Sequence, residues 1–405
     1  QAIRGRPTCW CYWSDLGWCY HTEGKQAAAL KAYTRCEELL EAKAPGLDGS
    51  VDLAARVRVK TELGIIHRQI GQVDQAVESF TQALDLDDES GIALQGAGEA
   101  YLAQAHARTS EGFYTAAVAA LRSGCHVMRR FLGIADQGNE SVGDGSASDD
   151  NHECAWKLLG DLYTYAHKLP PMCFVKDGAE GCGEERPVDK GTADAVAAQQ
   201  AFSKKGSTQR LRFVKLGAAA YQKVVDLLQS DEQMEQKNSH TSAKSERLAA
   251  ALYDLGLNYL LRCRLLCADS GEGSGLWGAD VYLSQPQVVE LSRFAEAAFK
   301  QALEADPLHS DSWNGLGTVS RDPLVQQHCW VRAVQLAHNP SAWANLGMLY
   351  VRWGLDIQAY ESLGGLQAVT DHPSMWVGLG LLKEKEAREP DTSKSKKRRL
   401  LSQVH

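Results

Sequence analysis

The sequence of 405 residues is long enough for one large core or for an extended array of repeats. It is 44% hydrophobic and 23% charged, and its formal net charge of -8 gives no general attraction to nucleic acid. No run of about eighteen apolar residues occurs, so no membrane span is predicted. Eleven cysteines, an odd number, favour reduced thiols in a cytosolic or nuclear protein over a disulfide framework.

The first predicted repeat covers residues 10–43. Its first helix carries Trp13, Gly17 and Tyr20, and its second helix, which follows a glycine turn, carries Ala29. The order of Trp, Leu-Gly and Tyr at this spacing is typical of the first helix of a tetratricopeptide repeat, and it returns near the end of the sequence. A recurring phrase of this kind predicts an array of helix pairs.

The second predicted repeat, residues 57–90, is the most regular. Its first helix carries Gly64, and its second helix carries a stripe of Ala76, Phe80 and Ala83 at helical spacing. The small residues are expected where two helices touch. The aromatic ring is expected to fill the gap between successive pairs.

A third repeat begins at Leu94, with Gly98 and Tyr101 on its first helix and an overlong second helix after them. Residues 10–134 are therefore interpreted as three repeats, the third with an extended second helix. Residues 135–150 are acidic, rich in Gly and Ser and poor in apolar side chains, which predicts a flexible loop.

The fourth predicted repeat is irregular and covers residues 151–228. Trp156 and Gly160 lie on its first helix, and a polar insert at residues 170–208 interrupts it. A polar linker is predicted to follow at residues 229–245.

Residues 246–382 predict further repeats, interrupted by a Gly-rich insert at residues 269–285. The contact positions are again glycine, alanine and aromatic residues: Gly256, Tyr259, Ala295, Phe299, Ala302, Trp313, Gly317, Trp343, Gly347 and Tyr350. Residues 383–405 predict a basic, disordered tail. The predicted fold is all-α, a right-handed superhelix of helix-turn-helix units with disordered polar inserts.

The ten tryptophans divide into two groups. Five occupy the position at which a tetratricopeptide helix packs on its neighbours, and they are expected in the core: Trp13, Trp156, Trp313, Trp343 and Trp376. The other five are less constrained, and an exposed member would be a candidate anchor for a partner: Trp10, Trp18, Trp277, Trp330 and Trp353.

The sequence contains no phosphate-binding Walker loop, no Gly-x-Ser-x-Gly elbow and no His-Glu-x-x-His pair. Cys9 and Cys11 lie near Cys19, but at a spacing that zinc sites do not use. The prediction is a non-enzymatic protein with no catalytic residue, no cofactor and no metal, and with no small-molecule substrate.

Two asparagines, Asn314 and Asn345, lie on first helices, which line the concave face of such arrays. They are candidates for binding a peptide backbone or carboxylate, which leaves open an alternative function as a co-chaperone or adaptor for peptide C-termini. The basic residues 394–399 suggest a nuclear import signal, a direct contact with RNA or a solvated tail.

Several segments together resemble the tetratricopeptide scaffold subunit of the superkiller (Ski) complex. They are residues 94–101 before an overlong helix, residues 154–161 after it, residues 311–317, the Gln-His-Cys at residues 327–329, and residues 341–347. The resemblance implies a non-enzymatic, cytoplasmic scaffold that gathers a DExH-box RNA helicase and WD40-repeat subunits. Through them it would act indirectly with the RNA exosome in 3'-to-5' mRNA decay.

Overall fold

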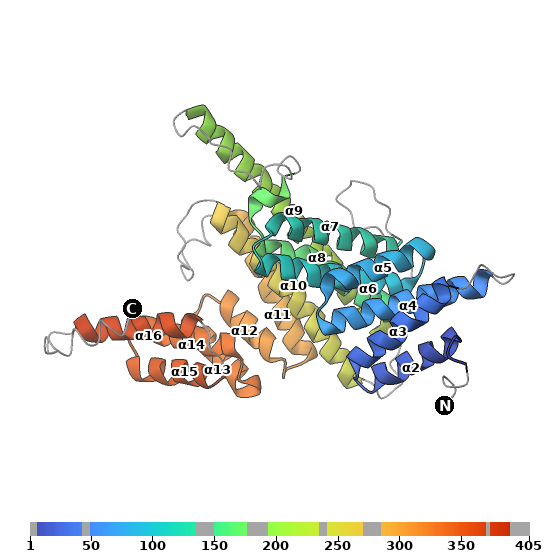
Figure 1. The fold of residues 1–405 in the computed structure, drawn as a ribbon. Coiled ribbons are helices and arrows are strands. Elements are labelled where there is room, and N and C mark those ends of the chain that lie inside the picture. The colour runs from blue at the N-terminus through green and yellow to red at the C-terminus, as the bar shows by residue number, and fades with distance from the viewer. Residues whose placement is uncertain are drawn as a thin grey trace. The chain divides into compact units, whose positions relative to one another are not determined.

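The computed structural model describes residues 6–42, 49–133, 150–175, 193–234, 241–269, 285–369 and 373–388. Within these ranges all regular secondary structure is helical, which confirms the predicted all-α class (Figure 1). No helix in this part of the chain has the length and apolar character needed to cross a membrane. The chain divides into two compact units, Gln1–Lys223 and Val224–His405.

The N-terminal unit is an array of helix pairs in which each helix packs against the next along the chain. The first three pairs are α2 (Trp10–Thr22) with α3 (Gln26–Glu41), α4 (Gly49–Ile70) with α5 (Val73–Leu86), and α6 (Gly91–Ser110) with α7 (Tyr114–Phe131). They are followed by α8 (Asp150–Tyr165), two short 3₁₀ turns at Ala166–Lys168 and Pro171–Phe174, and α9 (Ala193–Met234).

The turns inside the pairs share one backbone geometry. Gly24, Gly71 and Gly112 have φ angles of +74°, +85° and +84°, a left-handed conformation that glycine adopts without a steric penalty. In each turn the N–H of the residue after the glycine donates to a carbonyl five residues earlier, at 2.8 Å, as at Gln72 and His67. This bond closes the end of the first helix and directs the chain into the second.

Aromatic rings from second helices pack against glycines of first helices. Phe80 of α5 is fully buried, and a Cβ placed on Gly64 or Gly96 would overlap its ring. Tyr33 and Tyr221 lie against Gly17 and Gly160 in the same way. The missing side chains let helix backbones approach the rings closely.

The C-terminal unit repeats this construction from within α9 onward. Its helices are α10 (Thr241–Asp269), α11 (Pro286–Ala305), α12 (Ser310–Val319), α13 (Pro323–Ala337), α14 (Pro340–Trp353), α15 (Asp356–Val369) and α16 (Pro373–Arg388). Asp322 and Asn339 cap α13 and α14, because their side-chain oxygens accept from the N–H groups of Leu324 and Ala342 at 2.9 and 3.1 Å. Proline follows each cap at the first helical position, where its missing N–H costs nothing.

Several helices extend into segments that the sequence predicts to be irregular. α9 begins inside the predicted insert 170–208, and α9 and α10 both extend into the predicted linker 229–245. α16 ends at Arg388, inside the predicted tail 383–405. Residues 135–149 of the predicted loop 135–150 and most of the insert 269–285 lie outside the described residues, as do residues 176–192 and 389–405, whereas Asp150 begins α8.

Candidate functional site

The predicted contact positions lie along the helix interfaces. The alanines and phenylalanines are fully buried: Ala29, Ala76, Phe80, Ala83, Ala295, Phe299 and Ala302. The glycines and two aromatic residues are buried as well: Gly17, Gly64, Gly98, Gly160, Gly256, Gly317, Gly347, Trp156 and Tyr350. The remaining aromatic positions are half-buried: Trp13, Tyr20, Tyr101, Tyr259, Trp313 and Trp343.

Two of the half-buried tryptophans form hydrogen bonds with the segment that precedes their own helix. The indole Nε1 of Trp13 donates to the carbonyl of Pro7 at 2.8 Å, and that of Trp313 donates to Pro307 at 2.9 Å. In both cases the acceptor lies six residues before the tryptophan. These indole groups therefore serve the fold.

The structure corrects the division of the tryptophans in two places. Trp376, expected in the core, is 58% exposed, because α16 has no following helix among the described residues to cover it. Trp330, placed with the less constrained group, is only 2% exposed and donates from Nε1 to the carbonyl of Asn314 at 3.3 Å. Trp18 and Trp353 are exposed, and Trp277 lies outside the described residues.

Four cysteines are buried between helices. Burial raises the pKa of the Cys36 and Cys263 thiols to about 12 and that of Cys329 to about 11, and it raises the pKa of Cys125 as well. Cys36 donates to the carbonyl of Trp10 at 3.3 Å, which links the two helices of the first pair. Such thiols stay protonated and act as small core residues.

Native-state alkylation at about pH 8 is expected to modify Cys19 and Cys154 and to spare Cys36, Cys263 and Cys329. The first two are exposed, whereas the other three are buried and protonated at this pH. Peptide mass spectrometry after a short pulse of iodoacetamide measures the difference. Equal labelling of Cys329 and Cys154 would contradict the described packing, and labelling in denaturant provides the control.

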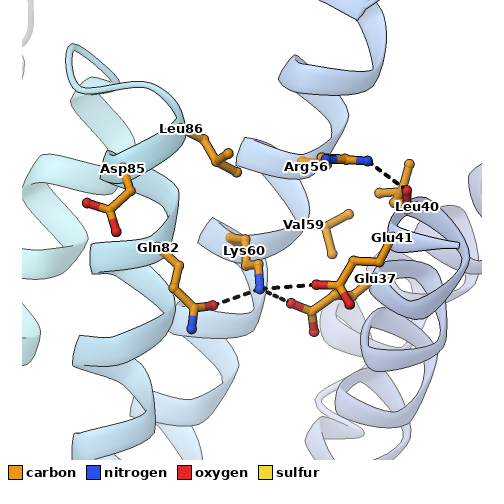
Figure 2. Close-up of a pocket in the computed structure, with 9 residues that line it drawn as sticks. All are labelled: Glu37, Leu40, Glu41, Arg56, Val59, Lys60, Gln82, Asp85 and Leu86. Atoms are coloured by element: carbon orange, nitrogen blue, oxygen red, sulfur yellow. Dashed lines mark hydrogen bonds and ion pairs between the residues drawn. The ribbon is translucent and has the colours of Figure 1, made fainter. Parts of the chain in front are cut away.

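A pocket of about 270 Å³ lies between α3, α4 and α5, with α4 between the two second helices (Figure 2). Its lining residues come from the C-terminal ends of α3 and α5 and from the middle of α4: Glu37, Leu40, Glu41, Arg56, Val59, Lys60, Gln82, Asp85 and Leu86. Leu40 and Val59 are buried and Leu86 is partly buried, so the pocket has an apolar floor.

The charged groups around this floor differ in how they are paired. Lys60 forms an ion pair with Glu37 and donates from Nζ to Gln82 Oε1 at 2.7 Å. Its Nζ also lies 3.9 Å from Glu41 Oε1 (Figure 2). Arg56 donates from Nη2 to the carbonyl of Leu40 at 3.0 Å, at the end of α3.

None of these nine residues is singled out in the sequence. They come from three helices, and the tetratricopeptide pattern describes only positions that pack a repeat together. The one available signal is the pair Glu37 and Glu41, which lie four residues apart and therefore on one face of α3. In the part of the chain that the structure describes, no group of three or more His, Cys, Asp or Glu side chains is arranged to hold a metal ion.

The two candidate asparagines lie on neighbouring first helices and contact each other. Asn345 Nδ2 on α14 donates to Asn314 Oδ1 on α12 at 2.9 Å, and both side chains are half-buried. The pair therefore links two repeats. Asn314 Nδ2 and Asn345 Oδ1 form no side-chain hydrogen bond with the described residues, so the pair retains N–H donors and one carbonyl acceptor.

Comparison with known sequences agrees with this architecture. The sequence model of the tetratricopeptide repeat matches residues 57–90, which contain most of α4 and all of α5. The chain contains a tetratricopeptide repeat. The match covers the predicted second repeat, and the helix pairs on both sides of it follow the same construction, so the fold is a tetratricopeptide solenoid.

Two curated proteins are similar to this chain along almost its whole length. Tetratricopeptide repeat protein 37 of Xenopus laevis and Superkiller complex protein 3 of Mus musculus are each 23% identical to it over 392 residues. The alignment covers 95% of this chain and 20% of each relative, so the chain spans about a fifth of their length. Among solved structures, Acl4, the assembly chaperone of RpL4, aligns at 14% identity with a TM-score of 0.37. The alignment covers 94% of this chain and all of the Acl4 chain.

Proposed function

We propose that the chain is a non-enzymatic tetratricopeptide scaffold of a Ski-type complex. It would assemble a DExH-box RNA helicase and a WD40-repeat subunit for cytoplasmic mRNA decay by the exosome. The observation that carries this proposal is the 23% identity to Superkiller complex protein 3 along 95% of the chain. A likeness spread over both compact units favours a shared architecture over one borrowed repeat.

The described surface is consistent with a scaffold. Several large apolar side chains are exposed on helices and turns of both units, including Ile92, Phe113, Leu324 and Ile357. Exposed apolar side chains supply contact area for partner proteins. The basic residues 394–399 would add nuclear import or an RNA contact to this role if they act as the sequence suggests.

Affinity purification of the full chain from its native source is expected to recover a DExH-box helicase and a WD40 protein, identified by mass spectrometry. An unrelated tetratricopeptide protein of similar length is the control bait, because it presents the same kind of helix array. Recovery of neither partner would overturn the proposal. Recovery of a chaperone in their place would favour the peptide-adaptor alternative, in which the Asn314 and Asn345 pair would bind the peptide.

A further inference from the structure

The pocket between α3, α4 and α5 lies where two helices end. Leu40 and Glu41 are the last residues of α3, and Asp85 and Leu86 are the last residues of α5. The C-terminal end of a helix carries a partial negative charge, which basic side chains of the last turn often offset. Neither helix has a basic residue in its last turn, and both have acidic ones. Two helix ends without a basic residue of their own therefore face one pocket.

The positive charges of the pocket are already engaged. Lys60 is shared between Glu37, Glu41 and Gln82, and its side chain is only 18% exposed. Arg56 is fixed to the carbonyl of Leu40, where its charge offsets the end of α3. Neither group is available to neutralise a carboxylate on the α5 side of the pocket.

Two carboxylates at the pocket are left without a close partner. Asp85 is exposed and forms no hydrogen bond or ion pair with the described residues. The Glu41 side chain is 66% exposed, and its approach to Lys60 is a distant 3.9 Å. They lie on opposite walls, one on α5 and one on α3, with Leu86 and Val59 between them (Figure 2). A positively charged group would gain Asp85 as a partner without displacing another group, and at Glu41 it would compete only with the 3.9 Å contact from Lys60.

The size and the floor of the pocket select the kind of group that fills it. At about 270 Å³ it is smaller than the roughly 300–1,000 Å³ of typical small-molecule sites, and it suits one or two side chains. Leu40, Val59 and Leu86 would contact an apolar side chain.

We propose that this pocket docks a segment of a partner protein in which an apolar side chain lies next to Lys or Arg. The apolar side chain occupies the floor, and the basic side chain pairs with Asp85 or Glu41. The pocket belongs to the N-terminal unit and the asparagine pair belongs to the C-terminal unit, and the proposal does not depend on membership of a Ski-type complex.

Selection of displayed random peptides against the immobilised full chain tests the proposal. We expect enriched peptides with an apolar residue beside Lys or Arg, and we expect Asp85→Lys to weaken the best of them by about tenfold or more in fluorescence anisotropy. Asp85 is exposed, so the substitution leaves the helix packing intact, and circular dichroism of the variant checks this. Asp85→Asn removes the charge and keeps the shape of the side chain. Its peptide affinity is expected to lie between that of the original chain and that of Asp85→Lys.

Glu290→Lys is the matched control, because it makes the same charge change at an exposed site of α11 in the other unit. Its affinity is expected to stay within about twofold of the original. Failure to enrich any peptide, enrichment of acidic peptides, or equal binding by the original chain and Asp85→Lys would each overturn the docking proposal. None of these outcomes affects co-purification of helicase and WD40 partners, so the two proposals fail separately.

Discussion

Phe299→Ala is expected to lower the free energy of unfolding of the C-terminal unit by about 3–5 kcal/mol. The ring is fully buried on α11, and a Cβ on Gly256 of α10 or on Gly315 of α12 would overlap it. Phe299 therefore packs against its own pair partner and against the next pair. Its removal leaves a cavity that the facing glycines cannot fill, because they have no side chain to move into it.

Phe294→Ala on the same helix is the matched control. Phe294 is 47% exposed and contacts Tyr259 at a ring-centroid distance of 5.7 Å, so its loss is expected to cost at most about 1 kcal/mol. Repeat arrays need not unfold in a single step, so hydrogen exchange of α11 and α12 in the full chain is a better measure than one melting temperature. Equal loss of protection in the two variants would show that Phe299 does not bridge the pairs.

The positions of Phe299 and Gly256 could be predicted because the information is local and repeated, whereas Gly315, which also faces the ring, is not among the predicted contact positions. Each repeat places glycine on the first helix and an aromatic residue on the second at fixed spacings. The regular repeat at residues 57–90 therefore shows which residues of the other repeats occupy the same positions. Gly71, Gly112 and Gly354 all adopt the left-handed conformation that suits the turn between two paired helices. The local pattern carries this part of the fold.

The pocket could not be predicted, because it depends on how separate helices end beside one another. Glu41 and Asp85 are 44 positions apart in the sequence and come together only when α3 and α5 pack on either side of α4. The pattern also does not predict where every helix begins and ends. For example, α9 begins at Ala193 in a polar stretch without tetratricopeptide spacing. Composition indicates whether a segment can form a core, but a polar segment can still be helical.

The burial of the tryptophans also could not be predicted from the local pattern, and one of them gives the second large expected effect on stability. Trp330→Ala is expected to cost about 3–5 kcal/mol, whereas Trp376→Ala is expected to cost at most about 1 kcal/mol. Trp330 is buried among Ala333, Leu346 and other core residues of the C-terminal unit, and its indole lies against Gly317. Its substitution removes a large ring and the hydrogen bond to Asn314.

The sequence pattern alone predicts the opposite ranking, because Trp376 occupies the consensus position and Trp330 does not. What decides the cost is the neighbour that covers each ring. Trp343, at the same consensus position in α14, lies against Gly365 of α15, the second helix of its own pair, whereas α16 has no such helix among the described residues. Urea unfolding of the two variants in parallel, followed by hydrogen exchange in α12–α16, distinguishes the rankings. A larger loss for Trp376→Ala would mean that a contact outside the described residues buries that ring.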